Sequence, residues 1–255
     1  MTRVIGVVSG KGGVGKTTVV SNLGVALAQE GHDVIVLDAD VTGANLGLHF
    51  GLTFYPHSLH DVVKDGVPFN RAVYNYMDRL DIVPASLSME HIELESDGLK
   101  DALLNSYLMD KDFALIDVST GLSSEAKAAI DVSNELILVT NPELPTLSDA
   151  LRTRELARRY EKRFIGAVLN RVKAEDIKKK GNVSNFLDLP VIGMLCEDYR
   201  VKESINSKTP ITISHPEAWN SVEFRNIALK ILGKEGSNSA KLVEKARYFI
   251  NVQVK

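Results

Sequence analysis

The stretch Ser9-Gly10-Lys11-Gly12-Gly13-Val14-Gly15-Lys16-Thr17-Thr18 decides the fold of this chain. It joins an apolar run over residues 4–8 to an amphipathic segment over residues 17–29. Its glycines let the backbone curl so that N–H groups point inward at an anion. The helix predicted to follow presents its N-terminus to the same anion. The pattern Gly10-x4-Gly15-Lys16-Thr17 therefore predicts a phosphate-binding loop between a strand and a helix.

Two side chains of this loop have predicted tasks. We expect Lys16 to reach the β- and γ-phosphates of a nucleotide and the Thr17 hydroxyl to bind Mg²⁺. ATP or ADP with Mg²⁺ is the predicted ligand. The residues predicted to contact it in this loop are Gly10, Lys11, Gly12, Gly13, Val14, Gly15, Lys16, Thr17 and Thr18.

The rest of the chain alternates short apolar runs with helix-like segments. The runs cover residues 4–8, 34–37, 80–84, 113–116, 136–140, 165–169 and 191–195, and the helix-like segments cover 17–29, 99–109, 146–163 and 217–232. Unbroken apolar runs are typical of strands buried on both faces. We predict an α/β fold with a doubly wound, mostly parallel sheet and helices on both faces. Residues 1–233 form the predicted ATPase domain, and residues 234–255 a hinge and C-terminal tail.

Composition narrows the function classes. The net charge is −3, with 30 basic and 33 acidic residues, so the whole chain is not an electrostatic nucleic-acid binder. A single cysteine, Cys196, excludes an internal disulfide or a thiolate metal cage within one chain and indicates a reducing compartment. No apolar window is long enough to span a bilayer. We predict a cytoplasmic protein, with attachment to the inner face of the cell membrane left open.

The additional lysine of the loop, Lys11, makes the loop resemble a known family. Residues 11–18 are similar to the deviant Walker A motif of the MinD/ParA branch of P-loop ATPases, and most closely to archaeal and bacterial MinD-like site-determining proteins. The resemblance implies an ATP-bound homodimer in which Lys11 of each subunit crosses to the phosphates of its partner. A cation there stabilises charge that develops in the transition state.

Carboxylates follow two of the predicted strands. Asp38 and Asp40 come at the carboxyl end of one strand, which faces the phosphate site in a doubly wound sheet. The stretch resembles the family's switch I, which implies that Asp38 binds Mg²⁺ through water, that Asp40 orients or deprotonates the attacking water, and that Asn45 makes switch or dimer contacts. Asp117 follows the apolar run over residues 113–116 and is predicted to bind the magnesium shell.

One segment departs from the family pattern D-x-P-A-G. Here it is Asp117-Val118-Ser119-Thr120-Gly121. The resemblance implies that the Gly121 N–H senses the γ-phosphate. Losing the proline loosens the backbone, and the added hydroxyls compete for hydrogen bonds. The departure leaves the hydrolysis rate open, so a weakly hydrolysing nucleotide switch remains an alternative.

The base site is predicted from two further matches. Asn170-Arg171 matches the position whose asparagine reads adenine in the family, and an amide can donate and accept in one plane as an adenine edge requires. The family's P-E-D loop, which flanks the adenine, is Cys196-Glu197-Asp198 here.

These patterns together predict a function and its partners. The leading prediction is a MinD-like ATPase for spatial regulation such as division-site placement, a slow enzyme stimulated by regulatory proteins at the dimer seam. The tail over residues 241–251 has amphipathic spacing suited to a membrane surface, against the alternatives of a docked or frayed end. Arginines over residues 151–164 keep a ParA-type DNA-partition ATPase open as the runner-up. A metallocluster reductase is disfavoured by the lone cysteine, and His49, His57 and His60 are only a weak metal signal.

Overall fold

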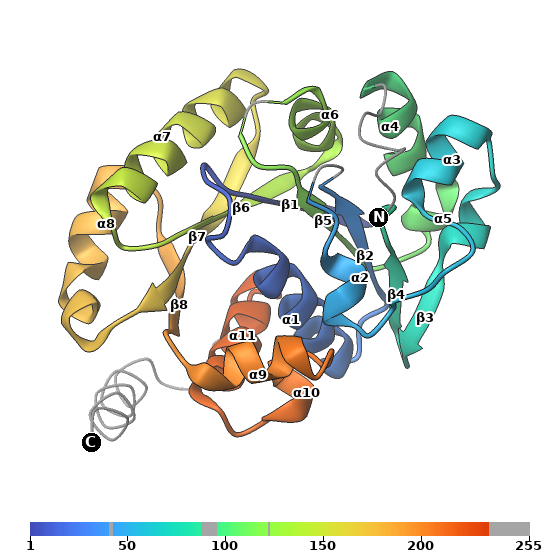
Figure 1. Ribbon diagram of the computed structural model, residues 1–255. Helices are drawn as coiled ribbons and strands as arrows, with labels where there is room; N and C mark the ends of the chain where they lie inside the picture. The colour runs from blue at the N-terminus through green and yellow to red at the C-terminus, as the bar shows by residue number, and fades with distance from the viewer. Residues whose placement is uncertain (41–42, 88–95, 122, 235–255) are drawn as a thin grey trace.

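One eight-stranded sheet organises the structure. The computed structural model describes residues 1–40, 43–87, 96–121 and 123–234 (Figure 1). The strand order is β3-β4-β2-β5-β1-β6-β7-β8, and every neighbouring pair is parallel except β3 with β4. The mostly parallel, doubly wound sheet is therefore confirmed. The strands are β1 (Arg3–Val8), β2 (Val34–Ala39), β3 (Tyr74–Met77), β4 (Leu80–Val83), β5 (Phe113–Val118), β6 (Glu135–Thr140), β7 (Arg163–Val172) and β8 (Val191–Cys196).

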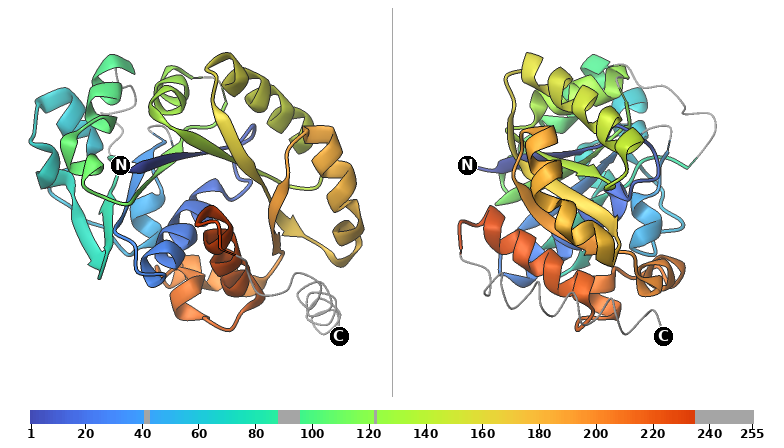
Figure 2. Two further views of the ribbon diagram at one scale, coloured as in Figure 1. Left: turned by 180° about the vertical axis from the view of Figure 1, so that it is seen from behind. Right: turned by 90° about the vertical axis from the view of Figure 1, so that its left-hand side faces the viewer.

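Helices cover both faces of the sheet (Figures 1 and 2). Apart from two short 3-10 segments, η1 (Phe69–Ala72) and η3 (Ala174–Lys179), the described helices on one face are α3 (Leu59–Asp65), α4 (Ser96–Leu103), α5 (Ser106–Met109), α6 (Ser124–Val132), α7 (Leu144–Arg159) and α8 (Lys180–Leu187). Those on the other side are α1 (Lys16–Gln29), α2 (Leu46–His49), α9 (Tyr199–Asn206), α10 (Ile211–Ser214) and α11 (Trp219–Ile231). An apolar core lies on each face. The central strands are thus buried on both faces, which explains their unbroken apolar runs.

The prediction of one continuous helix over residues 99–109 is wrong. Helix α4 ends at Leu103 and α5 begins at Ser106. Between them Asn105 caps the second helix, since its side chain accepts a hydrogen bond from the N–H of Tyr107. An asparagine side chain at this place competes with the helical hydrogen bonds and starts a new helix.

The basic helix also ends earlier than predicted. Helix α7 stops at Arg159, Glu161 turns the chain with a φ of 55°, and Arg163 belongs to strand β7. Two helical arginines, Arg154 and Arg158, donate to one carboxylate oxygen of Asp188 at 3.1 and 2.7 Å. Part of the positive charge is therefore neutralised within the chain rather than presented to a polyanion.

The C-terminal tail predicted over residues 234–255, with its amphipathic stretch 241–251, lies almost entirely outside the described residues. The domain boundary after residue 233 stays a prediction. Among the helices that the structure describes, none is long and apolar enough to cross a membrane.

Candidate functional site

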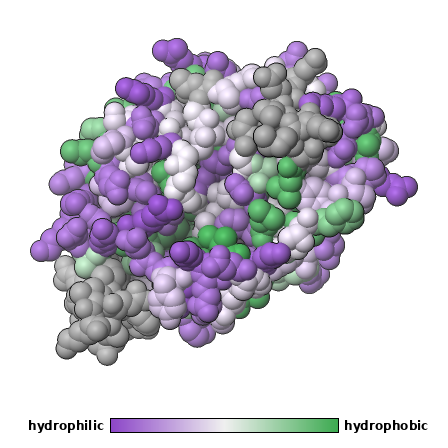
Figure 3. Space-filling view, in the orientation of Figure 1, coloured by the Kyte–Doolittle hydropathy of each residue, from purple (hydrophilic) through white to green (hydrophobic). Residues whose placement is uncertain are grey.

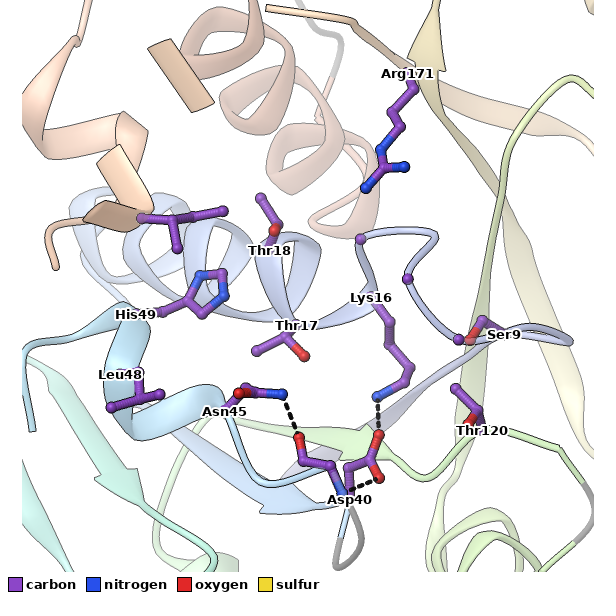
Figure 4. A pocket seen from close by; sticks show the side chains of 15 residues that line it. Ser9, Lys16, Thr17, Thr18, Asp40, Asn45, Leu48, His49, Thr120 and Arg171 are labelled. Atoms are coloured by element: carbon purple, nitrogen blue, oxygen red, sulfur yellow. Dashed lines mark hydrogen bonds and ion pairs between the residues drawn. The ribbon is translucent and has the colours of Figure 1, made fainter. Parts of the chain in front are cut away.

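The phosphate loop lies between the end of β1 and the start of α1. Helix α1 begins at Lys16, one residue earlier than predicted, and Gly15 precedes it with a φ of 96°. This left-handed conformation favours glycine. The loop borders a cavity of about 400 Å³ (Figure 4), whose lining includes Ser9, Gly12, Gly13, Gly15, Lys16, Thr17, Thr18, Asp40, Gly43, Asn45, Leu48, His49, Thr120, Arg171 and Ile205.

Lys16 joins the loop to two acidic side chains. Its Nζ lies 2.5 Å from Asp117 Oδ1 and 3.2 Å from Asp40 Oδ2, and Figure 4 shows the side chain extending toward Asp40. The Thr17 hydroxyl donates to Asp117 Oδ2 at 2.6 Å. Burial alone would lower the pKa of Lys16, but the charges of Asp117 and Asp40 outweigh it and raise that pKa. Four predicted site residues thus meet, although Lys16 and Asp117 are 101 residues apart in the chain.

Asp38 shapes the loop that follows β2. Its carboxylate accepts backbone hydrogen bonds from Asp40 at 3.1 Å, Asn45 at 3.1 Å and Leu46 at 3.0 Å. Burial, reinforced by the charge of Asp117, raises the pKa of Asp38 to about 8. These three hydrogen bonds connect the start of α2 to the end of β2. Asp38 therefore holds Asp40 and Asn45 beside the phosphate loop.

The donor set fits Mg²⁺. Among the described residues no group of three or more His, Cys, Asp or Glu side chains could hold a metal, and His49, His57 and His60 do not form one. Mg²⁺ needs fewer protein ligands, because it usually takes one or two carboxylates, water and substrate phosphates. Thr17 and Asp117 would supply hard oxygen donors beside the phosphate loop. When bound, the ion would neutralise phosphate charge.

Ser119 and Thr120, the residues that depart from the family pattern, have specific positions beside the site. The Ser119 hydroxyl donates to the carbonyl of Ala39 at 2.9 Å and lies 3.4 Å from Asp40 Oδ1. Thr120 lines the cavity, and Gly121 has a φ of 82°. A proline at position 119 has no hydroxyl, so the link between the end of β5 and the Asp40 loop is a property of this sequence.

Lys11 lies apart from Lys16. It is exposed, and no ion pair joins it to another residue in the described part of the chain. It borders a second cavity of about 260 Å³, together with Asn141, Glu143 and Arg171, and does not line the cavity that contains Lys16. Glu197, in the predicted base loop, lies at this second cavity too.

The structure adds residues that the sequence analysis did not assign to the nucleotide site. His49, Leu48 and Ile205 line the larger cavity. Burial lowers the pKa of His49 to about 4, so this imidazole is neutral near pH 7. In Figure 3 a group of hydrophobic residues lies near the middle of this face, with hydrophilic residues beside it. No local motif marks these residues, because α2 and α9 come together only in the folded chain.

Gly10 offers a test of how closely the loop packs. A Cβ at this position would lie 2.2 to 2.5 Å from backbone atoms of Asp149 and Ala150, whereas one at Gly12 would meet nothing within 4 Å. We expect Gly10→Ala to lower the free energy of unfolding of the nucleotide-free protein by about 1–3 kcal/mol. Gly12→Ala, the matched control, should change it by less than about 0.5 kcal/mol. Urea unfolding measures both, and equal midpoints would contradict the predicted contact with α7.

Cys196 is expected to be inert in the native state. Burial raises the pKa of its thiol to about 12, and the charges of Glu223 and Asp198 add to the effect. Against the unperturbed value of 9.0, the thiolate fraction at pH 8 falls about 1,000-fold. The native protein should therefore react with an aromatic disulfide reagent about 1,000-fold more slowly than the urea-unfolded protein, and the rate should rise with pH. Native and unfolded rates within tenfold of each other would refute this.

The fold and site define a class of protein: a P-loop nucleotide-binding domain on a doubly wound sheet. The sequence model of one protein family, the CobQ/CobB/MinD/ParA nucleotide binding domain, matches residues 5–211 of this chain. The chain belongs to this MinD/ParA family of deviant Walker A proteins.

Individual relatives are similar over nearly the whole chain. An uncharacterised ATP-binding protein of Methanocaldococcus jannaschii is 34% identical, with 100% of this chain and 96% of the relative covered. The septum site-determining protein MinD of Pyrococcus horikoshii, solved with Mg-ADP, is 32% identical with a TM-score of 0.84, covering 91% of this chain and 96% of its own. The MinC:MinD complex of Aquifex aeolicus contains a chain 25% identical with a TM-score of 0.82, covering 92% and 97%.

Proposed function

We propose that this chain is a MinD-like ATPase. It binds ATP with Mg²⁺, forms a homodimer in the ATP state, and hydrolyses the nucleotide slowly until a regulatory protein docks at the dimer seam. The cycle controls attachment to a surface and serves spatial regulation such as division-site placement. Support comes from the family membership and from similarity to septum site-determining proteins.

One observation carries the proposal: the position of Lys11. Lys16 lines the larger cavity and is paired with Asp40 and Asp117, whereas Lys11 is exposed at a neighbouring cavity of the same loop. A cation beside the loop but outside its own phosphate cavity is suited to the phosphates of a second copy. There it would stabilise charge on the transferring phosphoryl group.

The assembly state tests this proposal. Light scattering during size-exclusion chromatography should give a mass near 28.0 kDa with Mg-ADP and twice that mass with a slowly hydrolysed ATP analogue. A monomer under both conditions would overturn the ATP-dependent dimer.

Surface attachment is a separate test. We expect the full chain to sediment with anionic liposomes in the presence of Mg-ATP, and a chain cut after Gly233 to stay in the supernatant. A single weak anchor becomes effective when dimerisation doubles it. Equal sedimentation of both chains would argue against an anchor in the tail, and retention on DNA instead of lipid would favour the ParA-type alternative.

Ser119 favours one second candidate, a nucleotide switch that scarcely hydrolyses ATP. Asp40, the residue expected to act on water, is bonded to Lys16 and lies 3.4 Å from the Ser119 hydroxyl. Phosphate release in a single turnover distinguishes the two functions. A dimer that forms and releases phosphate when a partner protein is added supports the enzyme, whereas a dimer that retains ATP supports the switch.

A further inference from the structure

Strand β8 forms one edge of the sheet. It comes last in the strand order, so in the described part of the chain no strand pairs with its outer side. An open edge carries a row of N–H and C=O groups with which another chain can pair. The sequence of β8, residues 191–196, contains neither a charged residue nor a proline, so the strand itself does nothing to prevent such pairing.

Two polar side chains of helix α11 bond to this edge. Asn220 bonds to Cys196 twice, because its Oδ1 accepts from the backbone N–H at 2.8 Å and its Nδ2 donates to the carbonyl at 3.0 Å. Glu223 Oε1 accepts from the N–H of Met194 at 3.0 Å. The Asn220 amide thus reproduces the pair of hydrogen bonds that the backbone of a neighbouring strand would make.

Two longer side chains of α11 extend this pattern along β8. Trp219 Nε1 donates to the carbonyl of Met194 at 3.3 Å, and Lys230 Nζ donates to the carbonyl of Ile192 at 2.5 Å. The bonded positions of β8 are therefore 192, 194 and 196. They alternate, as groups that point away from β7 must do in an extended strand. One helix bonds the edge from the start of β8 to its end.

The close approach of α11 depends on a glycine in β8. A Cβ at Gly193 would lie 2.4 Å from Cδ1 of Ile227, a buried residue of α11, and Figure 1 shows the helix beside the strand. Asn220 and Glu223 are only 1% and 8% exposed. Water is thus largely excluded from these bonds, and the N–H groups of β8 would lack acceptors if the two side chains were removed.

A second copy of the chain is the partner that fits an open β8 edge. Two identical edges can pair antiparallel about a two-fold axis, and such a pair closes as a dimer. The opposite edge of the sheet, β3, is a poorer template, since it has four residues and its pairing is irregular between Asn75 and Met77. We propose that α11 acts as a substitute strand, whose side chains close the β8 edge to a second copy. This closure goes beyond the proposed ATP cycle and does not depend on it.

Removing the two side chains that accept from β8 tests the proposal. The double variant Asn220→Ala/Glu223→Ala leaves the N–H groups of Met194 and Cys196 without acceptors. In the absence of nucleotide we expect it to self-associate about 100-fold more tightly than the unaltered protein, because a second β8 restores these hydrogen bonds. Analytical ultracentrifugation over a range of concentrations measures the association. Amide hydrogen exchange at Met194 and Cys196 should slow as the dimer forms.

Ser221→Ala is the matched control. Ser221 lies on the same helix and is fully buried, but its hydroxyl donates to the carbonyls of Ile211 and His215 and not to β8. This variant loses buried hydrogen bonds while the edge stays closed, so it should remain a monomer. Glu223→Gln, which keeps an acceptor for the N–H of Met194, should remain a monomer too.

Two results would overturn the proposal. A double variant that stays monomeric, although exchange at Met194 and Cys196 is fast, would show that the bonds stabilise the fold without closing the edge. A dimer in which these two amides still exchange fast at high concentration would use another surface. If the double variant does not fold, Asn220→Ala alone decides, with the same expectation at a smaller magnitude. The measurements contain no ATP, so failure of the proposed ATP-dependent dimer would leave them unaffected.

Discussion

Lys16→Met is expected to weaken nucleotide binding about 100-fold and to destabilise the protein without nucleotide. The lost affinity reflects charge-assisted hydrogen bonds to phosphate. The lost stability has a separate cause in the structure. Lys16 and Asp117 are 5% and 1% exposed, and removing the cation leaves a buried carboxylate without a counterion. Breaking such a pair costs roughly 3–5 kcal/mol of unfolding free energy.

Two controls separate these effects. Lys11→Met removes an exposed lysine from the same loop and should leave the unfolding free energy unchanged. Lys16→Met combined with Asp117→Asn removes both charges and should recover most of the lost stability but none of the nucleotide affinity. Thermal unfolding and calorimetry measure the two quantities. If Lys16→Met melts at the same temperature as the unaltered protein, the pair does not stabilise the nucleotide-free state.

Lys11→Ala is expected to abolish ATP-dependent dimerisation and to lower partner-stimulated hydrolysis about 1,000-fold, the scale known for cations supplied in trans to a phosphoryl group. Affinity for Mg-ADP should change by less than about twofold, because Lys11 does not line the cavity that contains Lys16. In the proposed mechanism the charge of Lys11 acts only when a second copy brings its own phosphates to the loop.

Light scattering with a slowly hydrolysed ATP analogue and a phosphate-release assay measure the two losses. Lys173→Ala is a suitable control, since Lys173 borders the same smaller cavity as Lys11 but belongs to another segment. It should dimerise normally. A Lys11→Ala protein that dimerises and turns over as before would show that the mechanism proposed for this chain is wrong.

The site could be predicted from sequence where adjacent residues carry the chemistry. The loop from Gly10 to Thr18 is such a stretch, because glycine freedom, the helix N-terminus and the lysine act over a few bonds. Asp38 and Asp117 were predicted for a related reason: each ends an apolar strand, and the carboxyl ends of parallel strands meet at one edge of the sheet. Helix ends were less predictable, as the break before Ser106 and the early end at Arg159 show.

The sequence by itself determined the class of fold, the phosphate loop and the presence of a second lysine, since these depend on local patterns. Only the tertiary structure decided which groups meet. It bonded Lys16 to Asp117, left Lys11 at a separate cavity, and placed Asn170 on the Val14 carbonyl. Residues 14 and 170 are 156 positions apart, and no pattern within either segment specifies their contact. Such contacts arise from the packing of β7 beside the phosphate loop.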